Sequence, residues 1–104
     1  MHGNANTNDL PHHLYAIDDL QEKKEFKFGI SDDPIEADGL SKRAREQRDY
    51  CNLVVDWLRF TARIVLANIP NREKAKEIED EHMDAFEAEH GHLPRGNRRK
   101  NKNR

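Results

Sequence analysis

The spacing of apolar residues switches between a period of two and a helical period along this chain of 104 residues. Residues 13–18 and 25–31 alternate as strands do, and residues 40–54 then follow a helical period. Residues 59–69 alternate again and are rich in β-branched side chains, whereas residues 71–90 are helical. The order β-β-α-β-α predicts an α+β fold, a small three-stranded antiparallel sheet flanked by helices.

Turn and capping residues support these boundaries. The segment SDDPIEADG, residues 31–39, has the composition of a turn. Pro70 ends the third strand, Asn71 is suited to cap the following helix, and Gly91 and Pro94 end that helix. In the first helix the apolar stripe is expected to contain Leu40, Ala44, Cys51 and Val54, with Tyr50 at its edge.

We expect three parts in the chain, a polar leader (1–11) that ends in Pro11, a domain (12–98) and a basic tail (99–104). The net charge is −2, yet the last ten residues hold six Lys or Arg and no acid. A basic tail suits a polyanion, and the alternative is a solvated, frayed terminus. The expected substrate-binding residues are Arg95, Arg98, Arg99 and Lys100.

Several classes of protein are excluded by composition. No apolar run approaches the roughly 18–20 residues of a membrane span, and the N-terminus lacks the pattern of a signal peptide. A single cysteine, Cys51, excludes an internal disulfide framework and is expected in the core. Five histidines are considered as zinc ligands, and their spacings match no standard zinc site: His12, His13, His82, His90 and His92.

Two charged residues fall on helix faces that should be apolar. Glu79 lies about 40° from Ala75 and about 20° from Phe86 around the final helix, whereas Asp80 and Asp84 point to the opposite side. Because burying a carboxylate costs several kcal/mol, Glu79 is either a metal ligand or part of an ion pair.

Arg43 lies beside the expected core face of the first helix. It is therefore either paired with a buried carboxylate or directed at an anionic ligand. Tyr15 and Lys27 are expected on the sheet face opposite Phe26, Phe28 and Ile30. A strand tyrosine is often half-buried packing and a strand lysine is often a solvated charge.

Short motifs in one order resemble those of the GIY-YIG nucleases over about residues 12–98: HLYAI (13–17), KFGIS (27–31), LSKR (40–43), AKEIEDEHM (75–83) and PRGN (94–97). The longer segment FKFGISDDPIEADGLSKR is also similar to C-terminal nuclease domains of bacterial polymorphic toxins, such as those of the Rhs type. Two positions depart from the family pattern. Lys27 replaces its usual second tyrosine, and His13 replaces the first glycine of its name.

The resemblance implies a metal-dependent endonuclease that hydrolyses DNA. Glu79 would bind Mg²⁺ or Mn²⁺, Tyr15 would position or deprotonate water, and Arg43 would hold phosphate oxygens. Lys27 would stabilise a hydroxide or a phosphate oxygen, and Asn97 would tie the C-terminal loop to the site.

The resemblance to toxins also implies a biological setting. The domain would be secreted or delivered by a producing bacterium in interbacterial competition and would act in the target-cell cytoplasm, with a cognate immunity protein as partner and no membrane association. The alternatives are a catalytically inactive nucleic-acid-binding module and a nuclease of DNA repair or a mobile element.

Overall fold

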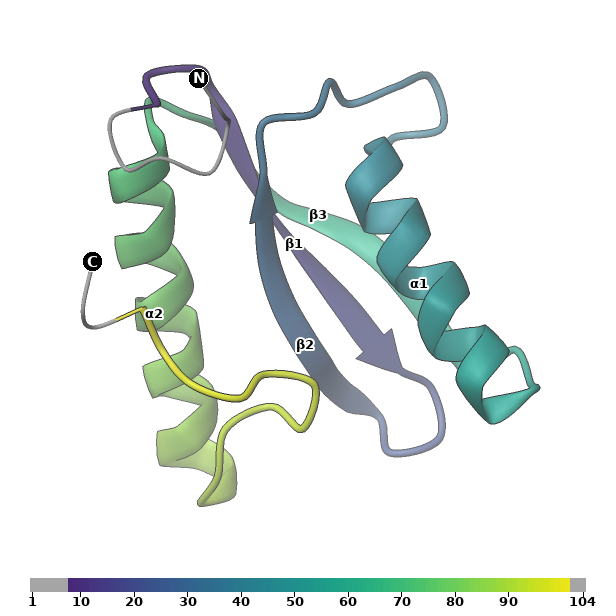
Figure 1. Ribbon diagram of the computed structural model, residues 1–104. Helices are drawn as coiled ribbons and strands as arrows, with labels where there is room; N and C mark the ends of the chain where they lie inside the picture. Colours follow the sequence, from purple (N-terminus) through teal and green to yellow (C-terminus); the bar gives the residue numbers. More distant parts are fainter. Residues whose placement is uncertain (1–7, 102–104) are drawn as a thin grey trace.

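The computed structural model describes residues 8–101, which form three strands and two helices in the expected order (Figure 1). The elements are β1 (His12–Asp19), β2 (Lys24–Ser31), α1 (Lys42–Val55), β3 (Phe60–Ile69) and α2 (Arg72–His90). The α+β class and the three-stranded antiparallel sheet are therefore confirmed. None of the described helices is long and apolar enough to cross a bilayer.

β1 is the central strand, because the order in the sheet is β2-β1-β3 and both neighbours pair with it antiparallel. Successive side chains of a strand point to opposite faces of the sheet. Leu14 and Ala16 accordingly contribute to one core cluster, and Tyr15 and Ile17 to another. α1 and α2 cover these two faces, so nearly all of β1 is buried (Figure 1).

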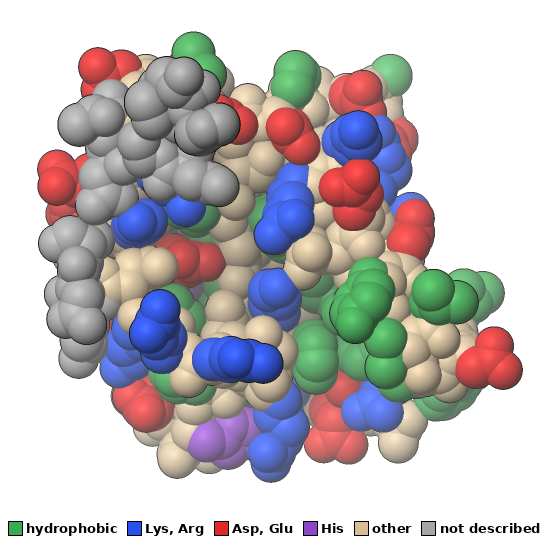
Figure 2. Space-filling model, in the orientation of Figure 1, with side chains coloured by type: hydrophobic (Ala, Val, Ile, Leu, Met, Phe, Trp, Pro, Cys, Tyr) green, Lys and Arg blue, Asp and Glu red, His purple; other side chains and the backbone are tan. Residues whose placement is uncertain are grey.

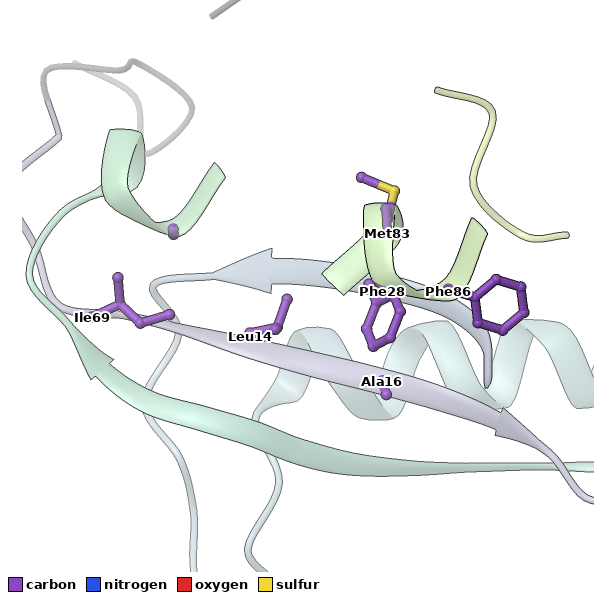
Figure 3. Close-up of a cluster of buried hydrophobic side chains, with 7 residues drawn as sticks. Leu14, Ala16, Phe28, Ile69, Met83 and Phe86 are labelled. Carbon is purple, nitrogen blue, oxygen red and sulfur yellow. The ribbon is translucent and has the colours of Figure 1, made fainter. Parts of the chain in front are cut away.

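The larger core lies between the sheet and α2. Phe28 and Leu14 from the strands meet Met83 and Phe86 from the helix, as Figure 3 shows. The smaller core lies between the sheet and α1, where Ala44 is the buried helix residue and contacts the cluster around Tyr15, Ile17 and Phe60. This second cluster contains few buried side chains, and a pocket lies beside it.

The expected apolar stripe of α1 is wrong at both ends. The helix begins at Lys42, so Leu40 precedes it, and Ser41 is the N-cap that accepts a hydrogen bond from the Ala44 amide. Tyr50 and Val54 are exposed, because they line an open pocket instead of closing a core. Cys51 packs against the core cluster and is only half-buried.

The face assigned to Phe26 is also wrong. The register between β1 and β2 shifts between Ile17 and Asp18, where Ile17 pairs with Lys27 and Asp18 with Glu25. Phe26 is the extra residue of this bulge, so alternation is broken there. Its ring packs in the α1-side core, 4.8 Å from the ring of Phe60, whereas Phe28 remains on the α2 side.

The segment after α2 turns back along the molecule, beside β2 and then along α2 (Figure 1). The Gly96 amide donates to the Phe26 carbonyl at 2.7 Å. Further on, the Asn101 amide donates to the Asp80 carboxylate at 2.6 Å. Asp80, expected to point outward, is therefore buried, because this segment covers it.

Candidate active site

Tyr15 is placed on β1 by the central position of that strand, and only 2% of it is exposed. Its partner across the β1–β2 pairing is Gly29. Burial raises the pKa of the phenol. Arg43 acts on the Tyr15 hydroxyl through its positive charge and as a hydrogen-bond donor, and both effects lower the pKa of the phenol, which opposes that rise only in part.

Lys27, the residue after the bulge, is half-buried on β2 and extends toward α1. Its Nζ donates to Gln47 Oε1 at 2.5 Å, which holds the amine between the strand and the helix. Burial lowers the pKa of this amine, and the positive charge of Arg43 lowers it further. The amine therefore loses its proton more readily than a solvated lysine does.

Arg43 lies in the first turn of α1 and is exposed, which corrects the expectation that it points to the core. Two side-chain contacts hold the start of this helix. The Arg43 amide donates to Asp33 Oδ2 at 3.1 Å, and Ser41 Oγ is hydrogen-bonded to His13 Nε2 at 2.8 Å. Among the described residues neither Arg43 nor Glu79 forms an ion pair, so the ion-pair alternative given above for each of these residues is wrong.

Glu79 is 7% exposed on α2, as its position in the apolar stripe predicted. Its carboxylate accepts a short hydrogen bond from the side chain of Asn101. Burial raises the pKa of Glu79, and the Asn101 hydrogen bond and the positive charge of Lys27 oppose the rise without cancelling it. The carboxylate is thus held in an environment that penalises its charged form.

The Asn97 side chain makes no hydrogen bond to Tyr15, Lys27, Arg43 or Glu79 within the described residues. Its side chain instead forms a pair of hydrogen bonds with the backbone of Phe28. Oδ1 accepts from the Phe28 amide at 2.8 Å, and Nδ2 donates to the Phe28 carbonyl at 2.9 Å. The amide thereby acts as one more strand partner for β2 and fixes the C-terminal loop beside Lys27.

The basic residues of the C-terminal segment differ in their surroundings. Arg95, Arg98 and Arg99 are exposed. Lys100 is not, because its ammonium pairs with Asp84 and, at 2.7 Å, with Glu87 of α2. Residues 102–104 of the expected tail lie outside the described part of the chain.

Tyr15, Lys27, Arg43 and Glu79 come from four elements, yet each lies within electrostatic range of others in the group. The charge of Arg43 acts on Tyr15 and Lys27, and that of Glu79 acts on the same two. On the face in Figure 2, Lys and Arg side chains run down the middle, between α2 and α1. We call these four residues the polar centre.

The ligands near the polar centre fit only certain metal ions. No group of three or more His, Cys, Asp or Glu side chains gathers at a metal-binding distance within residues 8–101. This excludes a preformed multi-ligand cage in that range. A single carboxylate such as Glu79 suits Mg²⁺, which takes one or two carboxylates and otherwise keeps water or phosphate oxygens as ligands.

Three residues that contribute to the site were not predicted from the sequence. Gln47 holds Lys27, Asn101 contacts Glu79, and Gly29 makes room for the Tyr15 ring. The glycine could have been predicted from the sequence, since a strand glycine opposite a bulky residue often marks a place where another group approaches the backbone closely. The contacts of Gln47 and Asn101 leave no local trace in the sequence.

A three-stranded antiparallel sheet between two helices, with four charged or phenolic groups within electrostatic range of one another, defines a small α+β domain. The chain matches the family described as URI fold toxin 2 over residues 5–91, and it belongs to that family. It is therefore a toxin domain of the URI fold. No curated protein and no solved structure matches it significantly.

Proposed function

We propose that this toxin domain is a metal-dependent endonuclease of the GIY-YIG type that hydrolyses phosphodiester bonds of DNA. The observation that carries the proposal is that Tyr15, Lys27, Arg43 and Glu79, from four elements, act on one another electrostatically. Phosphodiester hydrolysis needs groups that orient water, accept a proton and neutralise charge on phosphate oxygens. The polar centre contains a candidate for each of these roles.

Glu79 would hold a divalent ion, Mg²⁺ or Mn²⁺. When bound, the ion would neutralise negative charge on the leaving oxygen. The raised pKa of Glu79 fits this role, because a carboxylate that is unfavourable in the free protein gains most from a nearby cation. Its contact with Asn101 must then open or rearrange when the ion binds.

The protein side chains would act on the attacking water and the phosphate. Tyr15 has a raised pKa and stays protonated at neutral pH, so it would orient the water instead of deprotonating it. Lys27 has a lowered pKa and would accept the proton as the water oxygen bonds to phosphorus and the bond to the leaving oxygen breaks. Arg43 is exposed and would hold the non-bridging oxygens.

Outside the polar centre, Asn97 would act as a positioning residue and the exposed Arg95, Arg98 and Arg99 would contact the nucleic-acid backbone. Lys100, also expected to bind substrate, is already paired with Asp84 and Glu87. We therefore propose that it anchors the segment that carries the arginines.

The test is cleavage of supercoiled plasmid and labelled oligonucleotides, with Mg²⁺ or with EDTA. Cleavage should require the ion and should be lost in Glu79→Gln. Arg43→Lys should reduce it by about 100- to 1,000-fold, the usual effect of removing one donor to a developing oxyanion. Arg48→Lys is the matched control, because Arg48 is on the same helix and pairs with its neighbour Asp49.

Intact nucleic acid at high protein concentration would overturn the nuclease proposal. Binding without cleavage would favour the inactive nucleic-acid-binding module instead. Cleavage of RNA oligonucleotides and not of DNA would keep the chemistry and change the substrate.

Membership of a toxin family supports delivery from a producing bacterium into the cytoplasm of a target cell, and it disfavours the repair and mobile-element alternative. A cognate immunity protein is the proposed partner. Expression in a bacterial cytoplasm should arrest growth for the wild type and not for Glu79→Gln. Loss of toxicity on co-expression of a neighbouring gene would identify the partner.

A further inference from the structure

A pocket of about 360 Å³ lies next to the polar centre, between α1 and β2. This volume is within the range of roughly 300–1,000 Å³ that small-ligand sites occupy. The polar part of its lining includes Lys27 and Gln47. The apolar part includes Phe26, Val54 and Phe60. Lys27 therefore belongs both to the pocket and to the polar centre.

The walls of the pocket combine flat apolar surfaces with a few polar groups. The rings of Phe26 and Phe60 are 4.8 Å apart and tilted by 53°. The Arg59 guanidinium lies 5.4 Å from the centroid of the Phe60 ring, and Asp19 holds it there through two hydrogen bonds of 2.7 and 2.8 Å. Most of the charge of Arg59 is thus balanced, while the ammonium of Lys27 pairs only with the neutral amide of Gln47 in the described contacts.

We propose that this pocket binds an unpaired nucleobase of the strand that is cut, so that the preferred substrate is single-stranded or locally unpaired nucleic acid. The inference rests on the proposed nuclease function. A nucleobase has two apolar faces, a polar edge and a covalent link to phosphate, and aromatic side chains bind such faces regardless of sequence. Seated in the pocket, it brings its own phosphate to Lys27.

Charge complementarity favours this occupant over an apolar peptide side chain. Gly96 lines the pocket, the exposed Arg95 precedes it in sequence, and the exposed Arg98 follows two residues after it. A nucleotide provides an anion for these arginines and for Lys27, whereas an apolar side chain provides none. A base within intact duplex is stacked and paired, and extruding it costs a few kcal/mol, so fully paired substrates are disfavoured.

Cys51 allows a test that does not depend on cleavage. It is the one cysteine of the chain, it is half-buried, and it lines the pocket. Burial raises the pKa of its thiol, so alkylation by iodoacetamide is followed by mass spectrometry at mildly alkaline pH. Nucleoside monophosphates at millimolar concentration should slow this alkylation by about fivefold or more. Ribose 5-phosphate, which has the phosphate and no base, should not.

Equal protection by ribose 5-phosphate, or no protection by any nucleotide, would overturn the base pocket. Because the measurement needs no catalysis, protection without nuclease activity would leave the pocket standing and remove the proposed function. Cleavage without protection would do the reverse.

A matched pair of variants provides a second measurement. Val54 lines the pocket and is 66% exposed, whereas its neighbour Leu53 is 74% exposed and does not line it. Both positions should tolerate Glu, since neither is buried. Val54→Glu should lower cleavage of a single-stranded or mismatched oligonucleotide by about 5- to 100-fold, the range of base–aromatic contacts, and Leu53→Glu should stay within about twofold. Equal effects, or faster cleavage of the fully paired duplex by the wild type, would contradict the proposal.

Discussion

The ring of Tyr15 lies directly over the backbone of Gly29, so closely that a Cβ on Gly29 would stand 2.2 Å from both the Tyr15 hydroxyl oxygen and Cζ. The two residues are direct partners in the β1–β2 pairing. Glycine is therefore required at position 29 by the position of the phenol and not by its own backbone angles, which are not in the left-handed region.

Gly29→Ala should consequently displace the Tyr15 ring. We expect cleavage to fall by at least about tenfold and stability by about 1–3 kcal/mol, the usual cost of overpacking. Thermal melting and an oligonucleotide cleavage assay measure the two effects. If the clash is the cause, the substitution should cost less in a Tyr15→Leu background, with a coupling of about 0.5–3 kcal/mol; additive effects would show that it is not.

Glu79→Gln should remove one contribution to the pH dependence of stability. Burial raises the pKa of Glu79 above its ordinary value of 4.5, so the folded state holds this proton more tightly than the unfolded chain. The resulting stability is fully present below about pH 4.5 and is lost as the pH rises through the raised pKa. We measure both proteins in EDTA. The amount by which the melting temperature of the variant exceeds that of the wild type should therefore increase as the pH rises above 4.

The same two proteins also test the metal site without any cleavage assay. Mg²⁺ that binds only the folded state should stabilise the wild type by about 2.7 kcal/mol at 100 times the dissociation constant, and it should not stabilise Glu79→Gln. An equal shift in both proteins would show that the ion binds elsewhere.

Lys27 should determine how the cleavage rate depends on pH. If the neutral amine accepts the proton, the rate should rise with pH until the lowered pKa of Lys27 is passed. Lys27→Met should lose about 100- to 10,000-fold in rate, the usual contribution of a general base, together with this rise. Lys27→Arg keeps a positive charge that does not titrate in this range. An active Lys27→Arg variant with an unchanged profile would show that Lys27 only stabilises charge.

Asn97 should matter for stability and for the position of the C-terminal loop. Asn97→Ala removes two hydrogen bonds to Phe28 and should cost about 1–3 kcal/mol. Asn97→Asp should be at least as harmful at neutral pH, because a carboxylate can accept from the Phe28 amide and cannot donate to its carbonyl. Arg98→Ala, at the adjacent exposed position, should leave the melting temperature nearly unchanged. A stable Asn97→Asp variant would mean that the donated bond contributes nothing.

The basic C-terminal residues should separate into two groups in a salt titration of nucleic-acid binding. Neutralising Arg95, Arg98 and Arg99 should flatten the slope of log affinity against log salt by up to about 0.9 per lost phosphate contact. Lys100→Ala should leave the slope unchanged and lower the melting temperature slightly, because Lys100 already pairs with Asp84 and Glu87. Equal flattening by both changes would contradict this division.

The sequence predicted the strands and helices to within about two residues, because alternation and helical spacing are local properties that follow directly from burial. It also identified Glu79 as buried, since one charged position in an apolar stripe is visible without tertiary information. The face of Phe26 could not be predicted, because a bulge depends on how two strands meet. The burial of Asp80 likewise depends on a segment about twenty residues further along the chain.

The side chains of β1 alternate between two cores, so the proposed chemistry depends on one register of strand pairing. Tyr15 faces α1 while its neighbours Leu14 and Ala16 face α2. A slip of β1 by one residue would exchange the faces, bring Tyr15 under α2 and remove it from Arg43. A misregistered sheet could still bury apolar side chains on both sides, yet it could not assemble the polar centre. Only the correct strand register therefore places Tyr15 beside Arg43, so a chain that collapses in another register lacks the polar centre.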